Sequence, residues 1–175
     1  EPGGRIRFFG HEDLGAQIAA SRARALAFSG EEAARVQRIV GGHMRVHQMV
    51  QGGKQPTARA MYRFFRDTGA GGVDICLLSL ADTWATYCQT LPLEHWQAEL
   101  HICQILMEAR WERAEQIISP PRLVDGNDLM RALNLRPGPA VGRLLEAVRE
   151  AQVEGEVSTR EEAMEFIRRA AEDLV

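Results

Sequence analysis

The chain has 175 residues, of which 45% are hydrophobic and 26% are charged, and its formal net charge at pH 7 is −3. This size and composition are typical of a globular protein with one domain, or with a domain and a small appendage. The negative balance excludes a polycation, so any contact with nucleic acid has to come from local basic patches.

No long apolar run and no secretory signal is present, which argues against membrane insertion and secretion. The three cysteines have no CxxC spacing and lie in apolar helical patterns. Such cysteines are expected to be buried, reduced thiols of a cytoplasmic protein. The chain opens with Glu-Pro-Gly-Gly and not with Met, and we therefore expect it to be a piece of a larger protein.

Almost every segment has helical periodicity, and the alternation of a strand is nearly absent, which predicts an all-α protein. Only residues 6–9 suit a short extended piece. The first helix is expected over residues 11–27, and its inward side chains are Leu14, Ile18, Ala25 and Leu26. A second helix follows a capping box formed by Ser29 and Glu32.

The middle of the chain predicts a bundle around one apolar helix. After the loop at residues 51–56, a helix follows on which Met61, Phe64 and Phe65 share a face. The next helix, from residue 73 to 84, is apolar most of the way round, and we expect it to be the central one. A long helix then runs from Pro92 to about residue 118.

The double proline at Pro120 and Pro121 is the best boundary in the sequence, because it stops a helix and stiffens the link. We therefore expect two domains, residues 1–121 and residues 122–175. The second domain is predicted as three helices: two flank the turn Arg136-Pro137-Gly138-Pro139, and the last is capped by Ser158 or Thr159.

The Pro-Gly-Pro turn is the first candidate binding element. Pro139 can start a helix without losing a backbone hydrogen bond, and the first amides of that helix are left free. Free amides at a helix N-terminus suit an anion such as phosphate. The segment loosely resembles a helix-hairpin-helix, and its candidate RNA-binding residues are Arg136, Gly138, Gly142 and Arg143. The alternative is a tight turn without a ligand, whose glycines serve close packing.

A basic stripe is the second candidate. Arg59, Arg63 and Arg66 are spaced i, i+4 and i+7 on one helix, with Lys54 just before it. Such a stripe is able to follow a nucleic-acid backbone. The alternative is a solvated face, or arginines paired with Asp67 and Asp74.

The stretch from Leu123 to Phe166 closely resembles the C-terminal end of bacterial tRNA nucleotidyltransferases (CCA-adding enzymes) and related poly(A) polymerases. Three further segments, Phe8–Glu12, His43–Arg45 and Leu80–Asp82, resemble motifs of the HD-superfamily phosphohydrolase domains found in those enzymes. The resemblance implies an incomplete, multi-helix HD-like domain over residues 1–121. It implies the small C-terminal tail domain of the family over residues 122–175.

The same resemblance makes His11, His43 and Asp82 candidate ligands of a divalent metal that would activate water for phosphoester hydrolysis. The adjacent His-Asp pair of the superfamily is missing, so the site is incomplete. The alternative is that Asp82 hydrogen-bonds His11 or His43 without a metal. His43 and His47, at i and i+4, are a weak metal signal by spacing alone.

The resemblance implies a chain that binds tRNA or another RNA and positions it for processing of its 3′ end. The catalytic nucleotidyltransferase domain, with its Mg²⁺, is expected in a preceding part of the same protein, because the chain lacks the paired aspartates of the family. We therefore assign no catalytic residue and expect the chain alone to be inactive. The alternatives are a metal-dependent HD phosphohydrolase and a structural or dimer-forming helical module.

Overall fold

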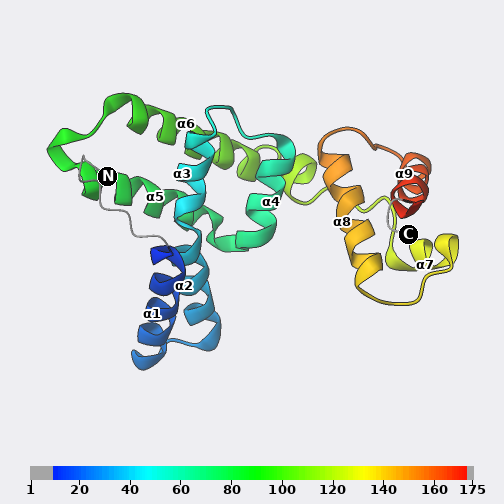
Figure 1. Cartoon of the computed structure of the whole chain (residues 1–175), viewed down its shortest axis with the longest axis horizontal. Coiled ribbons are helices and arrows are strands. Elements are labelled where there is room, and N and C mark those ends of the chain that lie inside the picture. Colours follow the sequence, from blue (N-terminus) through cyan, green and yellow to red (C-terminus); the bar gives the residue numbers. More distant parts are fainter. Residues whose placement is uncertain (1–9, 173–175) are drawn as a thin grey trace, which may run out of the picture. The chain divides into compact units, whose positions relative to one another are not determined.

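The computed structural model describes residues 10–172, so the extended piece predicted at residues 6–9 lies outside the described residues. Within this range every regular element is a helix (Figure 1), which confirms the all-α class. No helix among the described residues is long and apolar enough to span a membrane.

The contacts divide the chain into two units. The first contains the residues up to Gln55 and Phe64–Met107, and the second contains Pro56–Arg63 and the residues from Glu108 onward. The division falls within helix α4 (Ala58–Thr68). Pro120 and Pro121 therefore lie inside the second unit, and the domain boundary at residue 121 stays a prediction.

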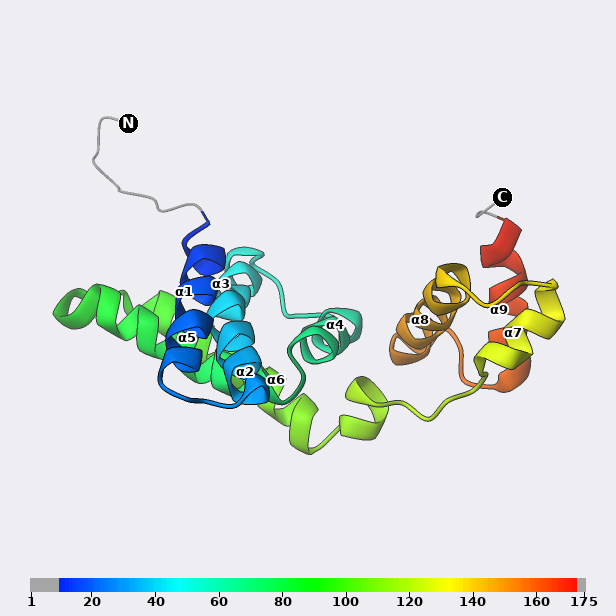
Figure 2. The same cartoon turned by 90° about the horizontal axis from the view of Figure 1, so that it is seen from below.

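The first unit begins with a hairpin of α1 (His11–Ala25) and α2 (Gly30–Gly42), which lie side by side (Figure 2). The face of α1 that is buried consists of alanines, namely Ala16, Ala20 and Ala23. Leu14, Ile18 and Leu26 are 60%, 60% and 58% exposed, and Ala25 is exposed as well. The inward face predicted for this helix is therefore wrong. The alanines, spaced i, i+4 and i+7, let the two backbones approach closely, and the larger side chains point to the other side.

The capping box of α2 forms as the sequence predicts. The Ser29 amide donates to Glu32 Oε2 over 2.8 Å, and the Glu32 amide donates to Ser29 Oγ over 3.2 Å. These two bonds satisfy amides that the first turn of a helix leaves without a partner.

Substitution of this cap tests its contribution. Ser29→Ala is expected to lower the free energy of unfolding by about 1 kcal/mol, because a first-turn amide loses its acceptor. Urea unfolding of the chain measures the change. The control is Ser21→Ala, at an exposed position of α1. An equal loss of stability in both variants would contradict the assigned cap.

The core of the first unit forms where α3 (Met44–Gln51), α4, α5 (Gly72–Tyr87) and α6 (Leu93–Trp111) meet. Its fully buried side chains include Val46, Phe64, Ile75 and Leu106. Gly42 lets α2 approach α5, since a Cβ there would lie 2.6 Å from Ile75 Cδ1.

Helix α5 buries one face in the core and exposes the other to solvent. Its buried face carries Ile75, Cys76, Ser79 and Thr83, whereas Leu77 and Trp84 are 62% and 57% exposed. The sequence predicted this helix as the central one, and it does pack against α2 and α3, but not all of its apolar side chains reach the core. The buried serine and threonine show that its inner face is partly polar.

The second unit contains the three helices predicted after the double proline: α7 (Gly126–Leu133), α8 (Pro139–Val153) and α9 (Arg160–Glu172). A π-helical turn, η3 (Ala114–Ile118), precedes them, so α6 ends before the predicted residue 118. One apolar cluster joins the three helices, and it includes Leu129, Leu144, Val148, Ala163 and Ile167. On the last helix Ala163 and Ile167 are buried, and Phe166 and Ala170 pack against the same cluster.

Candidate functional site

Helix α8 begins without a side-chain cap. Gly138 occupies the N-cap position with an extended backbone, Pro139 is the first helical residue, and the first turn has no acidic side chain. By contrast, α7 is capped reciprocally by Asp125 and Asp128. The positive end of the α8 dipole is therefore not compensated by any side chain of its own first turn.

Two arginines flank this helix start. Arg136 and Arg143 are exposed, and neither makes a hydrogen bond or ion pair with another described residue. Other arginines of the unit differ, since Arg131 and Arg160 both pair with Asp128 over 3.1 Å and 2.7 Å. The hydrogen bond from Arg160 lowers the pKa of Asp128. The charges of Arg136 and Arg143 thus remain available to an anionic ligand.

The two glycines beside these arginines are not required for packing. A Cβ at Gly142 would have no atom within 4 Å, and one at Gly138 would meet only the Arg136 carbonyl oxygen, at 3.9 Å. The alternative that these glycines serve close packing within the chain therefore has no support at Gly142. An open glycine inside a helix is instead suited to the close approach of a ligand.

Gly142 gives a test that separates stability from binding. Gly142→Ala is expected to raise the free energy of unfolding by about 0.5–1 kcal/mol, because alanine favours the helix and the space is open. If the phosphate of a ligand approaches this position, the same change weakens binding of that ligand. The contrast is Gly155→Ala, which should destabilise the chain because Gly155 has a φ of +77°. Loss of stability in Gly142→Ala would show that its surroundings are not open.

The basic stripe is largely paired within the chain. Arg63 donates twice to the Glu150 carboxylate, over 2.6 Å in each bond. Arg59 pairs with Glu154 and lies 3.7 Å from Glu150, whose side chain is only 12% exposed. These contacts hold α8 against residues 56–63. The carboxylates of these pairs neutralise part of the positive charge that an RNA backbone would meet.

The remaining members of the stripe, Arg66 and Lys54, do not pair with α8. Arg66 pairs with Asp67 over 2.8 Å, as the alternative of a paired face expects. Asp74 pairs instead with Arg35. Lys54 is exposed in the loop before α4. An RNA-binding role of the stripe stays a prediction.

The structure brings together two of the three predicted metal ligands. His11 Nε2 lies 3.2 Å from His43 Nε2, and His43 Nδ1 lies 2.7 Å from the Val40 carbonyl oxygen. The third, Asp82, instead faces His47, with Oδ2 3.7 Å from His47 Nε2. Asp82 is therefore grouped with a histidine that the resemblance did not select.

A second polar cluster lies between α3, α5 and α6. Glu99 is fully buried and accepts hydrogen bonds from Ser79 Oγ and Thr83 Oγ1, each 2.5 Å long. His47 Nδ1 lies 3.2 Å from Glu99 Oε1. The ring of His95 stacks on that of His47, with centroids 6.3 Å apart.

The protonation of His47 follows from its surroundings. Burial lowers the pKa of His47, and this effect outweighs the opposing influence of the Glu99 and Asp82 carboxylates. This shift favours the neutral form of the ring. The sequence noted His47 only with His43, as a weak metal signal, and His95 and Glu99 were not selected. The spacing of His95 and Glu99, one turn apart on a helix, is the signal that points to them.

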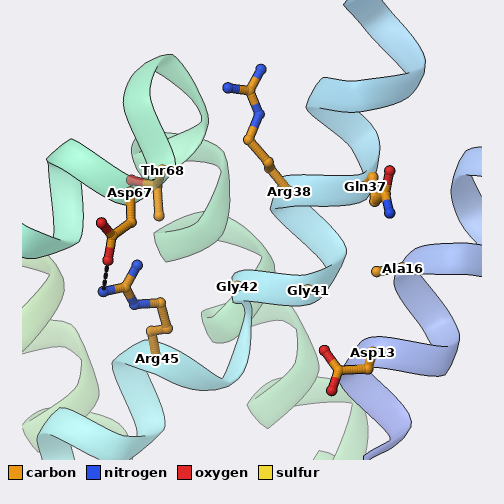
Figure 3. A pocket seen from close by; sticks show the side chains of 9 residues that line it. All are labelled: Asp13, Ala16, Gln37, Arg38, Gly41, Gly42, Arg45, Asp67 and Thr68. Atoms are coloured by element: carbon orange, nitrogen blue, oxygen red, sulfur yellow. Dashed lines mark hydrogen bonds and ion pairs between the residues drawn. The ribbon is translucent and has the colours of Figure 1, made fainter. Parts of the chain in front are cut away.

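A shallow cavity of about 370 Å³ lies between α1 and α2 and extends to the end of α4 (Figure 3). Its lining includes the cations Arg38 and Arg45 and the carboxylates Asp13 and Asp67. The Arg45–Asp67 pair spans 3.0 Å. Because the charges of the lining balance, this cavity has no net preference for an anion.

Comparison with known proteins gives a consistent picture. The family described as "tRNA nucleotidyltransferase domain 2 putative" matches residues 99–167. A CC-adding tRNA nucleotidyltransferase of Thermus thermophilus is 36% identical over 94% of this chain and 34% of its own length. An A-adding tRNA nucleotidyltransferase of Deinococcus radiodurans is 33% identical over 97% of this chain and 37% of its own.

A CC-adding tRNA nucleotidyltransferase of Synechocystis is 26% identical over 86% of this chain and 32% of its own length. The chain thus spans about a third of the length of the curated relatives that it matches. No solved structure matches it significantly.

Proposed function

The chain belongs to the tRNA nucleotidyltransferase family, and from this premise we propose that it binds and positions tRNA for processing of the 3′ end. Nucleotide transfer, with any Mg²⁺ that it requires, is assigned to a catalytic part of the protein outside these residues. The relatives named above add CC or A to tRNA, which supports tRNA as the class of ligand.

The start of α8 is the observation that carries this proposal. It combines a helix N-terminus without a side-chain cap, two exposed arginines without partners among the described residues, and an open glycine at position 142. Backbone amides and arginines at one place are the groups that bind phosphate. Residues 99–167, which match the family, include this element.

The chemistry of this element favours positioning over sequence recognition. Contacts with phosphate fix the register and orientation of a nucleic acid but carry no information about its bases. A tail that holds the tRNA backbone in this way sets the place of the 3′ end without choosing the nucleotide that is added. The choice between CC and A is therefore assigned to the catalytic part.

Titration of the full chain with tRNA tests the proposal. We expect saturable binding whose affinity falls as salt increases, with a logarithmic slope of about −0.7 to −0.9 for each neutralised phosphate. Two arginine contacts give a slope of about −1.4 to −1.8 on this scale. Single-stranded RNA of equal length is the control that shows whether the folded shape of tRNA matters for binding. Absence of binding, or an affinity that does not change with salt, would reject the assignment.

A further inference from the structure

Two histidines and two carboxylates from α3, α5 and α6 form a cluster that the proposed RNA-binding element does not use. We propose that His47, Asp82 and His95 bind a divalent transition-metal ion of the zinc class, and that Glu99 orients His47 for this role. The argument rests on the hydrogen bonds and burial of these four side chains. It is independent of whether the chain binds tRNA.

Glu99 fixes the proton of His47 on one nitrogen. Its carboxylate is completely buried and is held by the hydroxyls of Ser79 and Thr83. A carboxylate can only accept, so His47 Nδ1, 3.2 Å from Glu99 Oε1, carries the proton. The lone pair of the neutral ring is therefore on Nε2. The same order of carboxylate, histidine and metal orients most histidine ligands in metalloproteins.

The other nitrogen of His47 makes no hydrogen bond. This nitrogen, Nε2, is buried, and the whole His47 side chain is only 10% exposed. Asp82 Oδ2 lies 3.7 Å from Nε2, and it is an acceptor too. A cation between these two acceptors would satisfy the buried His47 Nε2, which the protein leaves without a hydrogen bond. The separation is shorter than the sum of a Zn–N and a Zn–O bond, about 4.0–4.3 Å, so one ion can reach both atoms.

His95 supplies the third donor. Its ring stacks on His47 at an interplanar angle of 3°. One ligand atom from each of His47, His95 and Glu99 lies within 4.8 Å of the others. With the Asp82 carboxylate, the imidazoles of His47 and His95 make up a donor set of a kind that zinc favours. Asp82 is 48% exposed, so the side toward solvent gives a path for the ion and a place for a water ligand.

A purely structural network accounts for only part of this arrangement. Hydrogen bonds explain why Glu99, Ser79 and Thr83 are buried together. They do not explain why His47 Nε2 is buried without a hydrogen bond while Asp82 Oδ2 lies 3.7 Å from it. A bound cation would satisfy both groups.

Calorimetric titration with Zn²⁺ tests the site in the full 175-residue chain, after chelator treatment and dialysis. The background carries Cys88→Ser, since Cys88 is the exposed cysteine among the described residues. We expect one equivalent of Zn²⁺ per chain and a thermal midpoint that rises with the free Zn²⁺ concentration. His95→Gln and Asp82→Asn are each expected to weaken binding by about 100-fold or more, since loss of an orienting residue alone costs about 10–100-fold.

The matched control is His101→Gln, which alters an exposed histidine of the same helix. It should leave Zn²⁺ affinity unchanged. Circular dichroism verifies that each variant is folded, and both tested positions are at least partly exposed. The site is rejected if no stoichiometric binding occurs. It is also rejected if binding survives both His95→Gln and Asp82→Asn, or is lost equally in His101→Gln.

Discussion

Replacing Arg136 and Arg143 together by glutamate is expected to weaken tRNA binding by about 100-fold. Each arginine makes no ion pair with another described residue, so its charge is available to a phosphate. A hydrogen bond to a charged group contributes about 1.5 kcal/mol or more, which corresponds to about tenfold in affinity for each arginine. Reversal of the charges adds repulsion to this loss.

The salt dependence distinguishes a lost phosphate contact from a general effect of charge. Loss of two contacts should reduce the slope of affinity against salt by about 1.4 to 1.8. The control is Arg168→Glu with Arg169→Glu, which makes the same change of net charge at exposed positions of α9 in the same unit. Equal weakening in both double variants would show that tRNA responds only to net charge, and the α8 site would then be wrong.

Glu99→Ala is expected to lower the free energy of unfolding by about 3–5 kcal/mol. Three buried donors lose their acceptor: the hydroxyls of Ser79 and Thr83, and His47 Nδ1. A buried donor without a partner costs about 1–3 kcal/mol. We expect the lower part of the resulting range, because serine and threonine in a helix can turn to a carbonyl of the preceding turn.

Urea unfolding measures this loss, with Glu94→Ala as the matched control at an exposed position in the first turn of α6. Glu99→Gln should fall between the two, because an amide keeps the shape and one acceptor of the carboxyl group. A Glu99→Ala variant as stable as the Glu94→Ala variant would show that the buried network does not hold α3 and α5 to α6.

The parts of the fold that the sequence predicted correctly depend on short-range signals. Ser29 with Glu32 is one such signal, because a capping box lies within a single turn. The three helices of the second unit are another, since Pro139 and the cap at Thr159 mark their starts locally. Side chains three or four residues apart decide these features whatever the rest of the chain does.

The buried face of α1 could not be predicted in this way. Hydrophobicity favoured Leu14 and Ile18, but the packing partner α2 accepts the face with the smallest side chains. That preference depends on the distance between two backbones, which no local pattern states. The same limit applies to Arg59 and Arg63, since their partners on α8 lie far along the chain.

The buried cluster was missed for a related reason, although one clue was present. Glu99, Ile102, Cys103 and Leu106 are spaced i, i+3, i+4 and i+7, so the glutamate lies on the apolar stripe of its helix. A charged residue at such a position requires buried partners. The sequence does not say which partners, because Ser79 and His47 come from other helices.

The alanine-lined hairpin of α1 and α2 has a consequence for local opening. Burial of alanines removes little apolar surface from water, while Leu14 and Ile18 add almost nothing to the contact. Segments with few buried apolar contacts open first, with a free energy well below that of global unfolding. Amide protons of α1 should therefore exchange with solvent ahead of those of α5, in an event that leaves the core around Phe64 and Ile75 intact.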